Sequence, residues 1–327
     1  MEECCLNKPS LRELVLYFLK LGATGFGGPI ALIGYMERDL VEKRGWFSTK
    51  EYKQGLALSQ LAPGPVAAQL AIYLGHVHSG ALGATAIGLA FTLPSFVIVV
   101  SLAAAYVHCG GLPWVHAVFY GVGAAVMAIM LRSAYHLTRS TMDKRRFLWA
   151  VYALLAVVTA VWQSEIGWLF VFSGVAALFL YAPPRALALR SLAPLPLLGL
   201  MAPQGLPPVS ASVLGQIFLF FAKAGTLIFG SGLVIVPFLY GGVVREFHWL
   251  NDRQFLDAVA VAMITPGPVA ITVAFIGYLV AGLAGSSAAA LGMFLPVYLF
   301  VVVPAAWFRK HGSNPQIEAF VDGVTAA

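Results

Sequence analysis

Hydrophobic residues form long runs along this chain, and short polar stretches separate them. Residues 258–308 contain no Asp, Glu, Lys, Arg or His. At about 1.5 Å per helical residue, this run is longer than one crossing of a hydrocarbon core about 30 Å thick. The runs therefore predict membrane-spanning helices, because the strands of a membrane barrel would alternate apolar and polar residues. The predicted apolar segments lie at about 12–36, 54–77, 81–107, 113–135, 147–162, 165–182, 212–244, 254–281 and 284–308.

Composition supports an all-α, polytopic transmembrane protein. The chain is 60% hydrophobic and only 10% charged, which excludes an ordinary soluble domain. Cys4, Cys5 and Cys109 have neither metal-ligand spacing nor the pattern of a disulfide framework. No phosphate-binding Gly-x-x-x-x-Gly-Lys-Ser/Thr motif occurs, so direct use of ATP is not expected. We predict no metal, no cofactor and no nucleic-acid partner, and the basic loops fit the charge bias of cytoplasmic loops.

An internal repeat dominates the chain. Residues 18–67 match residues 221–270, at an offset of 203 and without a gap. With an offset of 202 the match continues to the end of the chain, so we interpret the sequence as two homologous halves. The first half is residues 1–182, a proline-rich connector follows at 183–210, and the second half is residues 211–327, which we expect to be truncated. Identical pairs include Lys20 and Lys223, Gly22 and Gly225, Gly27 and Gly230, Trp46 and Trp249, and the Pro-Gly-Pro motifs at 63–65 and 266–268.

Each Pro-Gly-Pro motif lies inside an apolar run and is expected to break a helix. Proline lacks an N–H group, and glycine has a wide conformational range. A break creates a helix N-terminus with partial positive charge, which favours an oxyanion. Broken segments at matching positions of two halves are typical of a transporter's substrate site, although each glycine alone also permits close helix packing. The candidate substrate-binding residues at the breaks are Gly27, Gly28, Pro29, Pro63, Gly64, Pro65, Gly230, Ser231, Gly232, Pro266, Gly267 and Pro268.

Charged and polar side chains near the breaks extend this candidate site. Lys20 and Lys223 occupy matching places in apolar stretches, where a lysine either serves function or extends to the membrane interface. Hydroxyl and amide groups can donate to oxyanion oxygens, although each is also an ordinary helix residue. The acids predicted as coupling candidates are Asp257 and Glu165, and Asp257 is expected near the interface. The polar candidates are Thr24, Ser59, Gln60, Gln69, Thr265 and Thr272.

Loop charges constrain the topology. If every apolar segment crosses once, the basic loops at 37–53 and 132–146 fall on opposite faces, against the positive-inside tendency. The conflict disappears if a broken segment is a hairpin that enters and leaves on one side, buried in protein or lining a wet cavity. The sequence leaves open whether the two halves are parallel or inverted.

With these motifs, the chain resembles the chromate ion transporter family over both halves. A departure is Leu32, where members of the long-chain type often have histidine. The motifs that carry the resemblance are Phe26-Gly27-Gly28-Pro29, Pro63-Gly64-Pro65, Leu93-Pro94-Ser95, Phe229-Gly230-Ser231-Gly232, Phe255-Leu256-Asp257, Thr265-Pro266-Gly267-Pro268, Phe275-Ile276-Gly277-Tyr278 and Leu295-Pro296.

The resemblance implies a secondary transporter of the cytoplasmic (inner) membrane. Its expected substrate is chromate, with sulfate as a similar tetrahedral dianion, and export by alternating access would draw on the proton motive force. The alternatives are a permease or channel for sulfate or another inorganic anion, and a non-transporting membrane sensor. An enzyme is not expected, because the longest charge-free run contains no acids or histidines. The expected partners are the oxyanion and the lipid bilayer, and homo-oligomerisation is left open.

Overall fold

The computed structural model describes residues 9–109, 213–227 and 235–311, which form helices joined by turns and short loops. No strand occurs in these ranges, which confirms the all-α prediction for this part of the chain. The segments predicted between 113 and 182, the connector and Glu165 lie outside the described residues, as do residues 230–232. The helices are α1 (Leu11–Thr24), α2 (Gly28–Met36), the π-helix η1 (Glu37–Lys43), α3 (Thr49–Leu61), α4 (Val66–Cys109), α8 (Val213–Leu227), α9 (Ile235–Tyr240), the π-helix η4 (Gly241–Glu246), α10 (Asp252–Ile264), the 3₁₀-helix η5 (Val269–Ile271) and α11 (Thr272–His311).

Capping boxes that are readable in the sequence begin three of these helices. At the start of α1, the Glu13 N–H donates to the Ser10 hydroxyl at 3.3 Å, and the Ser10 N–H donates to the Glu13 carboxylate at 2.7 Å. This reciprocal pairing satisfies two N–H groups that the helix leaves without partners. The same arrangement joins Ser48 to Glu51 at α3 and Asn251 to Gln254 at α10.

Helices α4 and α11 are long and apolar enough to cross a membrane, as judged by length and composition. The backbone of α4 turns sharply at Ser79–Gly80, where Gly80 has a φ of 61°. Gly75 and Gly83 then lie so close that a Cβ on either would overlap the carbonyl of the other. Helix α4 is therefore a hairpin with a short first arm, 66–78, and a long second arm, 81–109. The matching parts of α11 are the turn at Ala281–Gly282, the pair Gly277 and Gly285, a first arm at 272–280 and a second arm at 283–311.

Helices α1 and α2 also fold back on each other. Gly27, with a φ of 106°, forms the N-cap of α2 and reverses the chain. Near the other end of the pair, the Tyr17 hydroxyl donates to the Tyr35 carbonyl at 3.3 Å. The Arg44 guanidinium lies 5.4 Å from the centre of the Tyr17 ring, so the chain leaves this hairpin beside the point where it enters.

The Pro-Gly-Pro motifs lie between helices. Helix α3 ends at Leu61 and α4 begins at Val66, and Gly55 of α3 lies against Leu70 and Tyr73 of α4. These contacts make α3 and the first arm of α4 an antiparallel pair. Helix α10 and the first arm of α11 flank the other motif in the same way.

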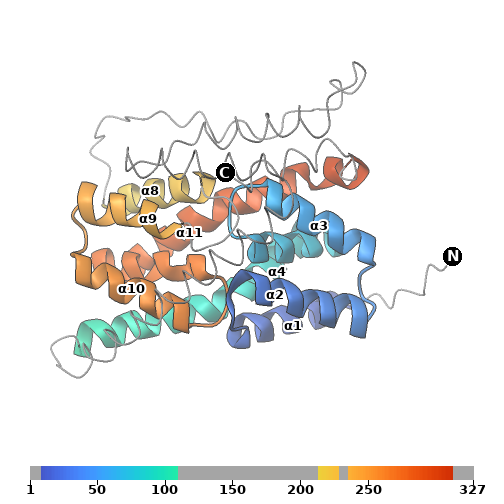
Figure 1. Ribbon diagram of the computed structural model, residues 1–327, viewed down its shortest axis with the longest axis horizontal. Coiled ribbons are helices and arrows are strands. Elements are labelled where there is room, and N and C mark those ends of the chain that lie inside the picture. Colours follow the sequence, from blue (N-terminus) through green and yellow to red (C-terminus); the bar gives the residue numbers. More distant parts are fainter. Residues whose placement is uncertain (1–8, 110–212, 228–234, 312–327) are drawn as a thin grey trace, which may run out of the picture.

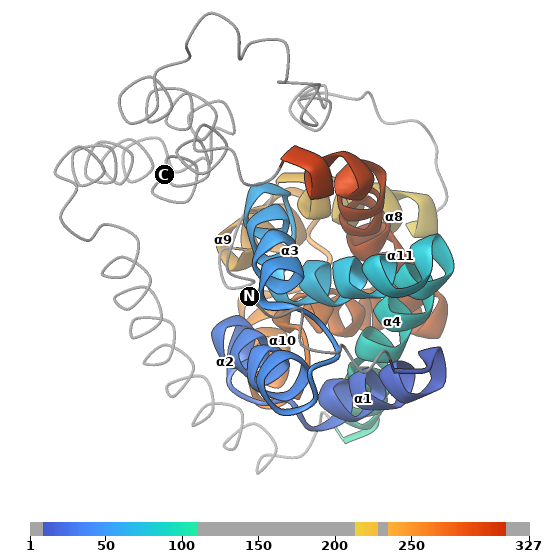
Figure 2. The same cartoon turned by 90° about the vertical axis from the view of Figure 1, so that its right-hand side faces the viewer.

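The second arms of α4 and α11 run in opposite directions. The Tyr298 hydroxyl lies 2.9 Å from the Thr85 hydroxyl and donates to the Ala81 carbonyl at 3.4 Å. Ala81 begins its arm, whereas Tyr298 lies sixteen residues beyond the Gly282 turn. In Figure 1 the green end of α4 accordingly lies on the side of α9 and α10, and the red end of α11 lies on the side of α3. Figure 2, seen from that side, has α3 and the red end of α11 toward the viewer.

Each second arm is built into the hydrophobic core of the other part of the chain. The first core contains buried residues of α1 to α4 together with Val297, Val301 and Phe308 of α11. The second core contains buried residues of α8 to α11 together with Val99 and Ala103 of α4. The two parts therefore share their packing and form one body.

Candidate functional site

The first Pro-Gly-Pro turn is buried and is supported from within its own hairpin. Gly64 has a φ of 131°, which side chains other than glycine rarely adopt. The Gln69 carboxamide reaches back from the first turn of α4, and its Nε2 donates to the Ala62 carbonyl at 3.2 Å and to the Pro63 carbonyl at 2.7 Å. A Cβ on Gly64 would lie 2.8 Å from Cγ2 of Val297, so the second arm of α11 covers the turn with an apolar side chain.

The second Pro-Gly-Pro turn is also buried, but it is bound to the other part of the chain. The Gly267 N–H donates to the Gly25 carbonyl at 2.9 Å. Beside it, the Ser95 hydroxyl donates to the Gly22 carbonyl at 3.1 Å. A Cβ on Gly267 would overlap the Ser95 hydroxyl, so glycine is required here by space as well as by its φ of 94°.

Helix N-termini lie at the first Pro-Gly-Pro turn and at the α1–α2 turn. Helix α4 begins at Val66 beside the first Pro-Gly-Pro, and α2 begins at Gly28 in the α1–α2 turn. The N–H groups of Ala68 and Gln69 donate to the Pro65 carbonyl. The leading N–H groups of α4, on Val66 and Ala67, have no intrahelical acceptor by their position. Such ends are electrostatically suited to an anion.

The two matching lysines are exposed, whereas the two Pro-Gly-Pro turns are buried. Lys20 on α1 and Lys223 on α8 are both exposed, and neither forms a salt bridge with another described residue. Their backbone carbonyls accept hydroxyl protons from Thr24 and Thr226, each at 2.8 Å. Of the glutamines predicted at the first turn, Gln60 is exposed and Gln69 is fully buried.

The hydroxyl groups proposed as donors are already bonded within their own helices or turns. Ser59 donates to the Gly55 carbonyl, Thr265 to Ala262 and Thr272 to Val269. Gly27 is exposed, while Gly28 and Pro29 are half-buried at the α1–α2 turn. Among the described residues, no group of three or more His, Cys, Asp or Glu side chains is arranged to hold a metal ion.

Asp257 is a buried carboxylate on α10, only 6% exposed, and was expected near the interface from its distance to Pro266. Its Oδ2 accepts a hydrogen bond of 2.8 Å from the Tyr106 hydroxyl, on the second arm of α4. Sequence reasoning did not find Tyr106, because 151 positions separate the two residues and only the opposed packing of the arms brings them together.

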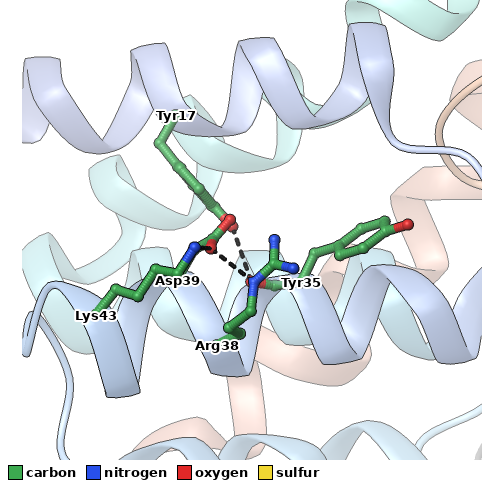
Figure 3. A network of polar contacts seen from close by, with 5 residues as sticks. All are labelled: Tyr17, Tyr35, Arg38, Asp39 and Lys43. Carbon is green, nitrogen blue, oxygen red and sulfur yellow. Dashed lines mark hydrogen bonds and ion pairs between the residues drawn. The ribbon is translucent and has the colours of Figure 1, made fainter.

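A polar network lies at the outer end of the α1–α2 hairpin, the end opposite the Gly27 turn (Figure 3). Asp39 on η1 accepts a hydrogen bond of 3.1 Å from Arg38, and Nζ of Lys43 lies 3.5 Å from the same carboxylate oxygen. Burial raises the pKa of Asp39, but the hydrogen bond and positive charge of Arg38, with a further contribution from Lys43, bring that pKa below its ordinary value. The carboxylate thus neutralises part of the basic loop predicted at 37–53.

The sequence model of the chromate transporter family matches residues 12–179 and 215–327 of this chain. The match covers most of the chain and includes both Pro-Gly-Pro turns. The chain belongs to the chromate transporter family. It is therefore a membrane protein of a transporter family, as the resemblance predicted.

Curated relatives extend over nearly the whole chain. A chromate transport protein of Cupriavidus metallidurans is 58% identical over 97% of this chain and 80% of its own length. A probable chromate transport protein of Synechococcus elongatus is 58% identical over 97% of this chain and 81% of its own length. A chromate transport protein of Pseudomonas aeruginosa is 33% identical over 97% of this chain and 78% of its own length. All three are named as transport proteins, which agrees with the expectation that the chain is not an enzyme. No solved structure matches the chain.

Leu32, the position at which the resemblance implied a departure from long-chain members, lies on α2. The Leu32 side chain is fully buried in the first core. A Cβ on Gly25 would meet Leu32 Cδ2, so leucine packs closely against the α1–α2 turn. Leu32 therefore gives this turn an apolar neighbour.

Proposed function

We propose that this chain is a multi-pass secondary transporter of the cytoplasmic membrane that exports chromate by alternating access. The observation that carries the proposal is the family match, together with relatives at 58% identity that are named chromate transport proteins. The proton motive force would drive export, and sulfate is a second substrate to be tested. These finer assignments are predictions.

The proposed architecture is an inverted repeat of two halves, 1–182 and 211–327, joined by the connector at 183–210. Matching sharp turns at Gly80 and Gly282, and the opposed second arms that they begin, support this interpretation. In each half, the broken segments would enter the membrane and return to the same face, and the second arm would cross it. Hairpins of this kind remove the conflict between loop charges and topology.

The proposed substrate site lies at the breaks, where helix N-termini provide N–H groups and positive potential. The candidate contacts are Gly27–Pro29, Pro63–Pro65, Gln60, Gln69, 230–232, Thr265 and Pro266–Pro268. Lys20 and Lys223 would offset the charge of the anion as it approaches. Asp257, held by Tyr106, and Glu165 are the proposed coupling acids.

The alternating movement would break and re-form hydrogen bonds at the second Pro-Gly-Pro turn. Gly267 with Gly25, and Ser95 with Gly22, join elements of the two parts of the chain. Movement of one part against the other would break or remake these two hydrogen bonds, as it would the bonds of Tyr106 to Asp257 and of Tyr298 to Thr85. The bonds of Gly267 to Gly25 and of Ser95 to Gly22 are between neutral groups, which suits contacts that form and break during transport.

Chromate flux into inside-out membrane vesicles tests the proposal. We expect saturable uptake that depends on the pH gradient, and a loss of at least tenfold in uptake in the double variant Lys20→Gln/Lys223→Gln. The matched control is Lys50→Gln/Lys53→Gln, which removes the same charge from two exposed positions near the start of α3. Full uptake in the first double variant would contradict the charge-offset role.

The same vesicles separate the alternative functions. Sulfate uptake that exceeds chromate uptake indicates a sulfate permease, and flux that is insensitive to the pH gradient indicates a channel. Chromate binding without flux in liposomes indicates a sensor.

A further inference from the structure

We propose that Gln69 makes this transporter selective for a tetrahedral oxyanion that carries one proton, hydrogen chromate rather than the chromate or sulfate dianion. The inference rests on the proposed function and concerns the first Pro-Gly-Pro turn. It assigns Gln69 the role of a hydrogen-bond acceptor, whereas the sequence suggested a donor.

The orientation of the Gln69 carboxamide is fixed by its neighbours. Its Nε2 lies 2.7 Å from the Pro63 carbonyl and 3.2 Å from the Ala62 carbonyl. Carbonyl oxygens only accept hydrogen bonds, so the NH₂ group must face them and Oε1 must face away. Both N–H groups of the side chain are thereby used within the turn.

The carboxamide oxygen of Gln69, Oε1, has no hydrogen-bond partner among the described residues. Gln69 is 0% exposed, and its Oε1 is a buried atom that no described residue contacts with a hydrogen bond. Buried polar atoms in proteins nearly always have a partner, so an exception needs an explanation. Gln69 belongs to the first turn of α4, the same turn that carries the leading N–H groups of Val66 and Ala67. The turn therefore combines N–H donors that have no intrahelical acceptor with one acceptor.

A protonated oxyanion matches that combination. Its deprotonated oxygens accept from the N–H groups of the helix N-terminus, and its single O–H donates to Gln69 Oε1. A dianion has no proton to donate, and it would place an oxygen lone pair against the lone pairs of Oε1. Chromate takes up its first proton near neutral pH, whereas sulfate and selenate do so only in strong acid. The same turn could thus separate chromate from sulfate, which differ little in shape.

The second Pro-Gly-Pro turn has no equivalent acceptor. At the offset of 202 that applies beyond residue 67, the apolar Ile271 matches Gln69, and the hydroxyl of the neighbouring Thr272 donates to the Val269 carbonyl at 2.7 Å. The Gly267 N–H at that turn is bonded to Gly25. The proposed selectivity therefore belongs to one turn only.

Protein titration must be separated from titration of the anion. Among the side chains on the helices packed against this turn, imidazole is the group that ordinarily titrates near neutral pH. Selenate is a control for this effect, because it meets the same protein groups but carries no proton at neutral pH. The titratable side chains on these helices nearest the turn in sequence are Lys20 on α1, Tyr52 and Lys53 on α3, Tyr73 and His76 on α4, and Tyr298 on α11.

The test is chromate flux by the full chain in proteoliposomes over a series of pH values. We expect the half-saturating concentration of total chromate to rise about tenfold per pH unit above the second ionisation of chromate, as the monoprotonated form declines. Excess selenate at neutral pH should leave the flux unchanged. A half-saturation that is flat with pH, or selenate competition as strong as that of unlabelled chromate, would overturn the inference. Absence of saturable chromate flux at every pH would instead overturn the proposed function.

A substitution at Gln69 tests whether this residue causes the pH dependence and the exclusion of selenate. Gln69→Met keeps the length of the side chain and removes the acceptor, so we expect the pH dependence to flatten and selenate to compete. Gln216→Met, at a partly buried glutamine of α8, should keep the wild-type profile. If Gln69→Met also keeps that profile, the assignment to Gln69 is wrong and a bound water suffices for Oε1. If this variant does not reach the membrane, the pH series and selenate competition on the unaltered chain still decide the selectivity.

Discussion

The two Pro-Gly-Pro turns have the same sequence but different support. The turn at Gly64 is held from inside its own hairpin by the Gln69 side chain, and an apolar residue, Val297, covers it. At the other turn, the Gly267 N–H donates to the Gly25 carbonyl, and Ser95 lies against Gly267. The support of this turn therefore comes from the other part of the chain. One turn is therefore a self-contained unit, whereas the other is part of the contact between the two parts of the chain.

This difference assigns distinct tasks to two copies of one motif. A turn whose carbonyls are bonded by a side chain of its own hairpin keeps its shape when its surroundings move. A turn whose N–H bonds to another element changes partner when that element moves. We therefore expect substrate selection to depend more on the Gly64 turn, and the conformational cycle to depend more on the Gly267 turn.

The largest effect is expected when a side chain is added at the Gly267 turn. Gly267→Ala places a Cβ against the Ser95 hydroxyl, at a φ of 94° that costs about 1–3 kcal/mol for a non-glycine residue. We expect loss of chromate resistance in cells, with partial recovery when Ser95→Ala removes the overlap.

Gly64→Ala sharpens this comparison, because the groups that obstruct it are Val297 and the amide nitrogen of Gln69, not Ser95. Its defect should be relieved by Val297→Ala and unaffected by Ser95→Ala. If Ser95→Ala rescues both glycine variants equally, or neither, the two turns are not supported in the different ways described here.

A smaller effect is expected at Asp257, the buried acid of α10. Tyr106→Phe leaves Asp257 Oδ2 without its donor, which costs about 1–3 kcal/mol for a buried polar group. Thermal unfolding of the purified protein in detergent measures the loss. Tyr298→Phe removes a hydroxyl that bonds to exposed Thr85 and should cost less. Equal losses in the two variants would show that Asp257 does not depend on Tyr106.

The smallest effect concerns the outer end of the α1–α2 hairpin. The pKa of Asp39 is lowered in the folded protein, so its stabilisation is present above the unfolded pKa, about 4, and is lost as pH falls through the folded pKa. Asp39→Asn should lower the unfolding free energy at pH 7 by less than about 1 kcal/mol. The difference from wild type should vanish once the pH lies below the folded pKa of Asp39. A difference that grows as the pH falls would contradict this sign.

Local sequence signals predicted several of these features. Proline and glycine located the interruptions at 63–65 and 266–268, and loop charge suggested that a broken segment returns to its own side. Neither signal identified the contacts of the turns. Ser95 lies 73 positions from Gly22, and Tyr106 lies 151 positions from Asp257, so no helical periodicity connects them. The role of Gln69 was not readable either, because the orientation of its amide depends on two carbonyls that only the folded turn brings near.

Chromate flux by the purified chain in proteoliposomes tests the central claim most directly, when wild type is compared with Gly267→Ala and Gly34→Ala. Gly34 lies on α2, and a Cβ there would meet nothing within 4 Å, so Gly34→Ala controls for the substitution itself. We predict saturable flux in wild type and in Gly34→Ala, and a loss of at least tenfold in Gly267→Ala. Equal flux in all three proteins, or none in wild type, would contradict the account of an oxyanion transporter that works through its Pro-Gly-Pro turns.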